Sequence, residues 1–163
     1  MSDTFQQSDF DEQELQQLEP INPTDVRLKA MDLLARREHS RQELMQKLLK
    51  RFSDAELINE QLDRLADDNL QSDARYAESY VRQRSNRGYG PLRIFQEMRQ
   101  RGIPDEGIQA AMNSADCDWY ANAEKVLHRK FGTAPAADIT DQARRSRFMQ
   151  YRGFSSDHFR DIL

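Results

Sequence analysis

The sequence predicts an all-α protein built from three tandem helical repeats that stack into an elongated, curved body. Apolar residues recur at helical spacing in segment after segment, and no stretch of useful length alternates with period two. Several of these segments open with a helix-capping pattern. A short motif also returns at a fixed spacing of 51 residues, as expected for a tandem repeat with several helices per unit.

The bulk composition limits the classes of protein. At 163 residues, with 37% hydrophobic and 32% charged side chains, the chain is long enough to bury a core and has a strongly solvated surface. No apolar run is long enough to span a membrane, and the first residues lack the pattern of a signal peptide. Cys117 is the only cysteine, which excludes an internal disulfide and a cysteine-based zinc site. We therefore expect a protein of the reducing cytoplasm.

Charge is unevenly distributed along the chain, although the net charge is only −4. Residues 1–73 hold 17 acidic and 9 basic side chains, whereas residues 74–163 hold 11 acidic and 15 basic ones. Arginine outnumbers lysine 19 to 5, and its planar guanidinium recognises phosphates and carboxylates in a bidentate manner. The whole chain is too acidic for a typical nucleic-acid binder, but its second half is a candidate binding surface.

Residues 1–23 carry six acidic side chains, five glutamines and no lysine or arginine. This composition is typical of a disordered or loosely helical acidic tail. Two interpretations of the tail are open. It is either a solvated extension without a specific role or an acidic arm that competes intramolecularly for the basic half of the chain.

The first repeat is predicted over residues 24–69. A helical stripe covers residues 26–37. The sequence Ser40-Arg-Gln-Glu43 is typical of a capping box, in which the serine accepts a backbone amide and the glutamate reaches back, and it opens a second helix. Ser53-Asp-Ala-Glu56 has the same pattern and opens a third. The apolar stripes of these helices consist of Val26, Leu28, Met31, Leu33, Leu34, Ala35, Leu44, Leu48, Leu49, Leu57, Ile58, Leu62 and Leu65.

The second repeat is predicted over residues 70–115. Ser72 caps a helix over residues 73–86, which ends in Gly88. Gly90-Pro91 then serves as the N-cap and first residue of the next helix. Helix punctuation thus explains both glycines and the proline, and the stretch lacks the sequence of a phosphate-binding loop. The expected buried stripe of the next helix consists of Leu92, Phe95 and Met98.

The recurring motif marks equivalent helix ends in the three repeats. Its copies are Phe52-Ser53-Asp54, Ile103-Pro104-Asp105 and Phe154-Ser155-Ser156, and each follows a basic helix end. A glycine precedes the last two copies and is suited to the left-handed C-terminal position. The first copy lacks this glycine, so the helix before it must end differently. Leu48, Met98 and Met149 match one another once that gap is allowed, and the third repeat follows over residues 116–163.

The candidate binding residues are arginines around Tyr89 and in the third repeat. Tyr89 lies between two glycines, and it either packs under the corner or stands exposed as a contact residue. The arginine run is either a solvated helix face or a partner-binding surface. The candidates of the second repeat are Arg82, Arg84, Arg87, Tyr89, Arg93, Arg99 and Arg101, and those of the third are Arg129, Lys130, Arg144, Arg145, Arg147 and Arg152.

No group of residues typical of an enzyme or a metal centre stands out in the sequence. His39, His128 and His158 do not have the spacing of metal ligands. Cys117 has no adjacent histidine and is expected to pack beside Trp119. We therefore predict no catalytic residue, no bound metal and no cofactor.

Four stretches of the chain resemble, in the correct order, the successive signatures of the RecX family, the regulatory proteins of bacterial RecA recombinase. They are LLARREHSRQELMQKL (Leu33–Leu48), RGYGPLRIFQEMRQRGI (Arg87–Ile103), DWYANAEKVLHRKFG (Asp118–Gly132) and RFMQYRGF (Arg147–Phe154). The likeness spans about Val26 to the C-terminus. It leaves out the acidic tail and does not account for the missing glycine before Phe52.

The resemblance implies three three-helix repeats in a curved stack, and a regulatory protein rather than an enzyme. It implies binding to RecA and the RecA–DNA filament, with either blocked filament growth or net disassembly and with reduced ATP hydrolysis, strand exchange and LexA co-protease activity. Binding along the helical groove and capping of filament ends are both open. Weak binding to single- or double-stranded DNA is compatible with it, and we expect a monomer. Two other classes are open from the residues alone: a direct DNA-binding regulator and a generic helical scaffold for another acidic partner.

Overall fold

A computed structural model describes residues 20–163, and all regular secondary structure within that range is helical. The elements are α2 (Pro23–Arg36), α3 (Arg41–Leu49), α4 (Ala55–Asp67), α5 (Asp73–Asn86), α6 (Pro91–Gln100), α7 (Asp105–Ala115), α8 (Trp119–Phe131), α9 (Ile139–Arg152), α10 (Ser156–Phe159) and the 3-10 helix η1 (Arg160–Ile162). The prediction of an all-α fold is confirmed. The predicted acidic tail lies, up to residue 19, outside the described residues.

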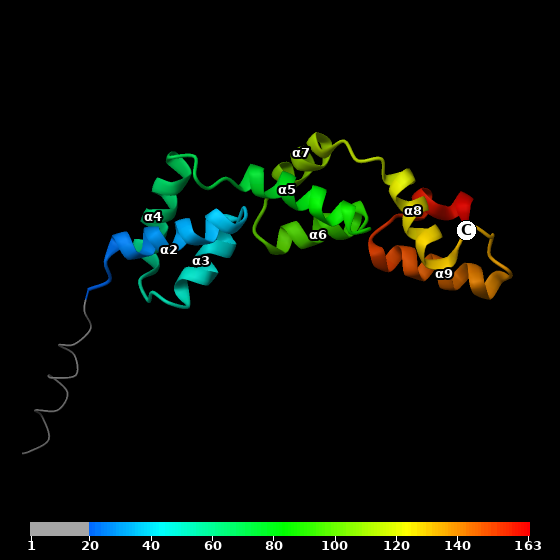
Figure 1. Ribbon diagram of the computed structural model, residues 1–163, viewed down its shortest axis with the longest axis horizontal. Helices are drawn as coiled ribbons and strands as arrows, with labels where there is room; N and C mark the ends of the chain where they lie inside the picture. The colour runs from blue at the N-terminus through cyan, green and yellow to red at the C-terminus, as the bar shows by residue number, and fades with distance from the viewer. Residues whose placement is uncertain (1–19) are drawn as a thin grey trace, which may run out of the picture.

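The helices form three groups that follow one another along the longest axis of the molecule (Figure 1). Helices α2–α4 form the first unit at one end, α5–α7 the second unit in the middle, and α8 to η1 the third unit at the other end. In each of the helix pairs with the most extensive packing, such as α5 with α7 and α2 with α4, both helices belong to the same unit. The body is therefore elongated, as a tandem stack requires.

Each unit buries a hydrophobic core of its own. The first core consists of Val26, Ala30, Leu44, Leu48, Phe52, Ile58, Leu62 and Leu65. The second consists of Tyr76, Ala77, Val81, Ile94, Met98, Ile103, Ile108 and Ala111, and the third of Ala123, Leu127, Met149, Phe154 and Phe159. Cys117 and Trp119 both pack against the second core, and Trp119 also packs against the third. This tryptophan is therefore shared between two units.

The recurring motif closes the second helix of each unit, as predicted. Phe52, Ile103 and Phe154 are buried, and so are the matching Leu48, Met98 and Met149. In the second unit Gly102 adopts φ +81°, and the Ile103 amide donates to the Met98 carbonyl at 3.2 Å. Phe154 donates to Met149 in the same way at 3.1 Å. In the first unit the Phe52 amide donates to the Leu48 carbonyl at 2.8 Å. This bond spans four residues instead of five, so that helix ends without a left-handed glycine.

Two of the predicted helix caps need correction. The Ser40 hydroxyl does accept the Glu43 amide at 3.1 Å, but the Glu43 carboxylate turns toward the second unit instead of back to Ser40. The predicted cap at Ser53 is wrong, because the Asp54 carboxylate accepts the Leu57 amide at 3.0 Å and α4 starts one residue later than expected. An aspartate caps a helix as well as a serine, so the sequence pattern alone did not distinguish the two positions.

The buried stripes are narrower than the sequence predicted. Leu28, Met31, Leu49 and Leu92 were expected on apolar faces, yet all four are exposed, with Leu92 at 55%. On α6 the predicted Met98 is buried, and the second buried residue is Ile94 instead of Leu92 or Phe95. Each helix packs against only two others inside a small unit, so a pair at i and i+4 fills the available contact. The caps at Ser72 and at Gly90-Pro91 and the span of α5 are confirmed.

Candidate functional site

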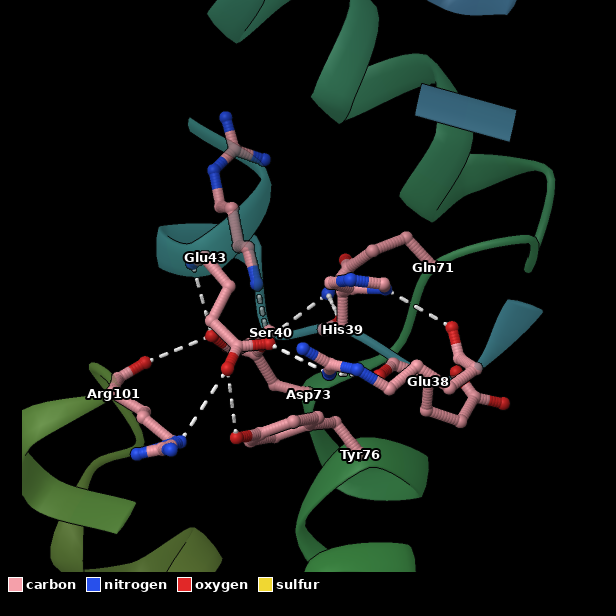
Figure 2. Close-up of polar contacts among 10 residues, drawn as sticks. Glu38, His39, Ser40, Glu43, Gln71, Asp73, Tyr76 and Arg101 are labelled. Carbon is pink, nitrogen blue, oxygen red and sulfur yellow. Dashed lines mark hydrogen bonds and ion pairs between the residues drawn. The ribbon is translucent and has the colours of Figure 1, made fainter. Parts of the chain in front are cut away.

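The first and second units meet at a polar joint (Figure 2). Ser40, the N-cap of α3, donates its hydroxyl proton to the Arg101 carbonyl at the end of α6, at 2.9 Å. The Arg41 amide donates to the Asp73 carboxylate at 2.8 Å, and the Gln71 side chain donates to the His39 carbonyl at 3.3 Å. These bonds connect the start of α3 to the second unit.

Glu43 is the central anion of this first joint (Figure 2). Its carboxylate accepts the Tyr76 hydroxyl at 3.3 Å and forms ion pairs with Arg101 at 3.4 Å and with Arg37 at 3.1 Å. Burial, and secondarily the charge of Glu43, raises the pKa of Tyr76 above its ordinary value, so the phenol stays protonated and donates. Charges of both signs therefore compensate one another at the first joint.

The second and third units meet at a joint with the same plan. Gly90, the N-cap of α6, donates its amide to the Arg152 carbonyl at 2.8 Å, and Leu92 donates to the Gly153 carbonyl at 3.0 Å. Gly90 thus takes the place of Ser40, and Arg152 takes the place of Arg101. In both joints the start of the second helix of one unit contacts the end of the second helix of the next.

Close backbone contact explains two glycines of this second joint. Gly153 has φ +97°, and a Cβ atom there would lie 2.3 Å from the Arg93 Cβ. A Cβ atom on Gly90 would lie 2.4 Å from the Gly153 carbonyl carbon. Both distances are far below van der Waals contact, so only glycine permits this approach. The glycine of the recurring motif therefore serves both the helix end and the joint.

Tyr89 is half-buried against the second core and is covered by arginines from two units. The guanidinium carbons of Arg84, Arg93 and Arg152 lie 3.8, 4.7 and 5.0 Å from its ring centroid. These distances are within the range of cation–π attraction. The structure thus places Tyr89 under the corner, with its ring covered by arginine side chains.

Glu97 binds two of the predicted arginines. Its carboxylate accepts Arg84 at 2.5 and 2.8 Å, Arg93 at 3.0 Å and the Tyr80 hydroxyl at 2.6 Å. Burial alone would raise the pKa of Glu97, but the hydrogen bonds from these three side chains outweigh it and lower the pKa to about 2. Burial, together with the bond to Glu97, raises the pKa of Tyr80 to about 12. The guanidinium groups of Arg84 and Arg93 are therefore engaged inside the molecule.

Other predicted arginines also have carboxylate partners in the chain. Arg99 pairs with Asp105, and Arg101 pairs with Glu43 as described above. Asp141 pairs with Arg144 and Arg145, and the buried Arg145 also donates to the Ala134 carbonyl at 2.8 Å. These contacts tie the loop before α9 to the helix.

The remaining predicted cations have no carboxylate partner within residues 20–163. They are Arg82, Arg87, Arg129, Lys130, Arg147 and Arg152. Four of them, Arg87, Arg129, Lys130 and Arg152, line a pocket of about 120 Å³ with Gly88, Val126 and Phe148. An adjoining pocket of about 130 Å³ shares Gly88, Val126 and Arg129 and adds Ser85, Asn86, Asn122 and Lys125. We call the two together the junction pocket, because both lie between the second and third units.

Sequence reasoning did not bring this group together and missed Lys125. The four lining cations predicted from sequence were divided between two clusters, because Arg87 lies more than forty residues before the others. The spacing of Lys125 and Arg129 at i and i+4 on α8 was a usable signal. In the part of the chain that the structure covers, no three His, Cys, Asp or Glu side chains are placed to hold a metal ion. No helix in that part is long and apolar enough to cross a membrane.

Comparison with known proteins assigns the chain to a family. Models of the first, second and third three-helix domains of RecX match residues 27–65, 72–112 and 116–163. Regulatory protein RecX of Pseudomonas entomophila is 49% identical over 141 residues, covering 86% of this chain and 91% of that protein. RecX of Halorhodospira halophila is 45% identical over 135 residues, or 83% and 84% of the two chains.

Solved structures agree with this assignment. The crystal structure of RecX from Lactobacillus salivarius matches with a TM-score of 0.68 at 25% identity, over 86% of this chain and 93% of that one. A second crystal structure of a regulatory protein RecX matches in fold with a TM-score of 0.72, over 86% and 72% of the two chains at 24% identity. With three domain models in order and close relatives along most of its length, this chain belongs to the RecX family of regulatory proteins.

Proposed function

We propose that this chain binds RecA recombinase and the RecA–DNA filament and inhibits filament growth, ATP hydrolysis, strand exchange and LexA co-protease activity. Through these effects it modulates DNA repair by homologous recombination and the SOS response, and it acts in the cytoplasm. It works as a binding protein without catalytic chemistry. Family membership and the regulatory role of its relatives support this proposal.

The elongated three-unit body is the observation that carries the proposal (Figure 1). A filament of identical subunits presents the same surface again and again, and a stack of repeated units is suited to lie along it. Such a ligand inhibits when it binds one state of the filament more tightly than the state that grows or hydrolyses ATP. No active site is needed for this effect.

The uncompensated cations support the second and third units as the part of the body that meets the partner. Arg82, Arg87, Arg129 and Arg147 are exposed and lie on the second and third units. Both a DNA backbone and an acidic protein surface attract such groups. Arg84 and Arg93 are unsuitable for a binding test, because their substitution would leave the half-buried Glu97 without its guanidinium partners. Variants of the exposed arginines separate binding from stability.

The test is ATP hydrolysis by RecA on single-stranded DNA, titrated with this protein at fixed salt near 0.15 M. Inhibition at far less than one molecule per RecA supports binding at filament ends or during growth. Inhibition only near saturation supports binding along the filament. No inhibition at any ratio contradicts the proposal.

A direct DNA-binding regulator is the second candidate, and the carboxylate-free junction pocket favours it. Adding excess DNA after inhibition has been established separates the two functions. Competition for DNA predicts that the extra strand restores ATP hydrolysis, because it binds the inhibitor and provides new sites for RecA. Binding to the RecA protein itself predicts that inhibition persists.

A further inference from the structure

We propose that the junction pocket binds phosphate groups of a nucleic-acid backbone, and that bound phosphate holds the second and third units together. This inference rests on the proposed function and deepens it, because it assigns the cations of the pocket to nucleic acid rather than to protein. The argument uses charge, the packing around the cations, the shape of the site and its position at a joint.

The charge of the junction pocket is not balanced by the chain. The lining cations are Arg87, Lys125, Arg129, Lys130 and Arg152, and neither part of the pocket has a carboxylate in its lining. The pocket at the first joint differs, because its lining includes Glu38 and Glu43 as well as Arg37 and Arg101. Five like charges repel one another, and an anion between them relieves that repulsion.

The packing around the cations leaves charged N–H groups available. The guanidinium of Arg152 lies 5.0 Å from the Tyr89 ring centroid and 5.4 Å from that of Phe148, and it donates one bond to the Arg87 carbonyl at 3.4 Å. The Lys130 amino group lies 5.9 Å from the Phe148 ring centroid. Aromatic rings and a carbonyl thus position these cations without neutralising them. Such preorganised donors suit an oxyanion.

The size and division of the pocket favour a chain of phosphates over a single ion. Its first part, at about 120 Å³, has the volume of roughly four water molecules, enough for one phosphate with little else. The second part, at about 130 Å³, adjoins it and shares Arg129. Asn86 and Asn122 add neutral hydrogen-bonding groups there. Two neighbouring cationic positions, the second of which also has neutral polar groups, match successive phosphates of one strand.

The pocket is divided between two units, which couples binding to the joint. Arg87 and Gly88 come from the end of α5, whereas Arg129, Lys130 and Arg152 come from the third unit. Arg152 takes part in both the joint and the junction pocket, since its carbonyl accepts the Gly90 amide and its guanidinium lines the pocket. An anion held by residues of both units must therefore stabilise their contact, by ordinary linkage.

The binding test uses the full chain and a fluorescein-labelled single-stranded oligothymidylate, with anisotropy measured at several KCl concentrations. The test variant is the double substitution Arg87→Gln with Arg129→Gln, and the matched control is Lys50→Gln with Arg51→Gln in the first unit. All four side chains are exposed, and both pairs remove two charges, but only the first pair lines the junction pocket. Folding of each variant is checked by thermal unfolding.

The pocket variant is expected to bind about 10-fold more weakly at 0.1 M KCl, with the slope of log K against log salt reduced by about 1.4, or 0.7 for each lost single-strand contact. The control is expected to change affinity by less than about 3-fold, through long-range charge alone. Equal losses in the two variants, or no loss in the pocket variant, would overturn the inference. Equally tight, pocket-dependent binding of a labelled polyglutamate peptide would also overturn it.

The coupling to the joint has its own measurement. Amide hydrogen exchange of Gly90 and Leu92 reports the two bonds between the units, and saturating oligothymidylate should slow both by at least about 3-fold. Inorganic phosphate at the same total phosphate concentration should slow them less. Unchanged exchange contradicts the coupling, and equal protection by free phosphate would assign the site to small anions instead.

The inference and the proposed function fail in different experiments. If the wild-type protein does not inhibit ATP hydrolysis by RecA, the proposed function fails whatever the oligothymidylate shows. If it inhibits RecA while the pocket variant binds oligothymidylate like wild type, only the phosphate site fails.

Discussion

The arginine side chains of this protein differ in the partner that each guanidinium finds. Arg84, Arg93 and Arg145 are held by carboxylates inside the chain, whereas Arg87 and Arg129 face a pocket without one. Their sequence neighbourhoods look alike, because both kinds lie on polar helix faces. The sequence therefore predicted the residue type of the candidate site, but not which arginines remain free. That choice depends on which carboxylate another helix brings within reach.

Glu97 provides a test of this division at the residue scale. Its pKa of about 2 lies below the ordinary value of 4.5, so it contributes stability that is fully present above pH 4.5 and lost as pH falls toward 2. That contribution is on the order of 3 kcal/mol. We expect Glu97→Gln to lower the free energy of unfolding by about 2–3 kcal/mol at pH 7, because two half-buried guanidinium groups lose their counter-charge.

Urea unfolding followed by circular dichroism, at pH 7, 5 and 3, measures this effect. The difference between wild type and Glu97→Gln should be largest at pH 7 and 5 and smaller at pH 3. Glu124→Gln is the control, since Glu124 is exposed and forms no ion pair among the described residues. A difference that stays constant from pH 7 to 3 would show that the loss is not electrostatic.

At the scale of single helices, the sequence predicted the existence and order of the helices better than the residues that cap them. The helices at 73–86 and from Pro91 appear as expected, because glycine and proline end and start helices for local reasons. The cap of α4 was placed one residue too early, at Ser53 instead of Asp54. The first unit closes its preceding helix without a glycine, and this shortens the connection by one residue.

The corrected cap of α4 predicts a clear loss of stability for one of two neighbouring substitutions and little change for the other. Asp54→Ala removes the oxygen that accepts the Leu57 amide and should lower the free energy of unfolding by about 1 kcal/mol. Ser53→Ala is the matched control and should change it by less than about 0.5 kcal/mol, because Ser53 is exposed and does not cap. Urea unfolding of the two variants decides between the positions. A larger loss for Ser53→Ala would restore the cap expected from the sequence.

At the second joint, a substitution of Gly90 is expected to disturb the contact between the start of α6 and the end of α9. Gly90 has φ −88°, which any residue adopts, so Gly90→Ala acts only through the 2.4 Å contact of its new Cβ with Gly153. We expect a loss of about 1–3 kcal/mol and faster amide exchange at Leu92. Gly132→Ala is the control, since Gly132 has φ +81° but nothing within 4 Å of its Cβ position. It should destabilise through backbone strain alone and leave exchange at Leu92 unchanged.

At the scale of the whole molecule, the two joints are what the sequence could not reveal. The recurring motif predicted three equivalent helix ends, and the buried residues confirm them. The start of α3 or α6 contacts the equivalent helix end of the following unit. This contact depends on residues from two units at once. Ser40 and Gly90 have different chemistry, yet they occupy equivalent positions in the two joints. The alignment that matches Leu48 with Met98 also places Ser40 opposite Gly90, but their different side chains do not indicate that both residues contact the next unit.

The charge of the whole chain leads to the last prediction. Residues 1–19 hold six acidic and no basic side chains, whereas the rest of the chain holds 22 acidic and 24 basic ones. An acidic arm that competes for the basic half should weaken the binding of nucleic acid. We therefore expect that replacing the six acids by their amides, at constant length, tightens oligothymidylate binding about 2- to 10-fold at 0.05 M KCl.

Salt and the pocket variant show whether this effect is competition for the junction pocket. Because screening shortens the reach of charge to about 3 Å at 1 M salt, the gain should shrink steadily as KCl is raised toward that concentration. It should also be much smaller in the Arg87→Gln, Arg129→Gln background, where the contested site is already weakened. A gain of the same size in both backgrounds would mean that the arm repels nucleic acid generally. No gain at any salt concentration would identify residues 1–19 as a solvated extension without a part in binding.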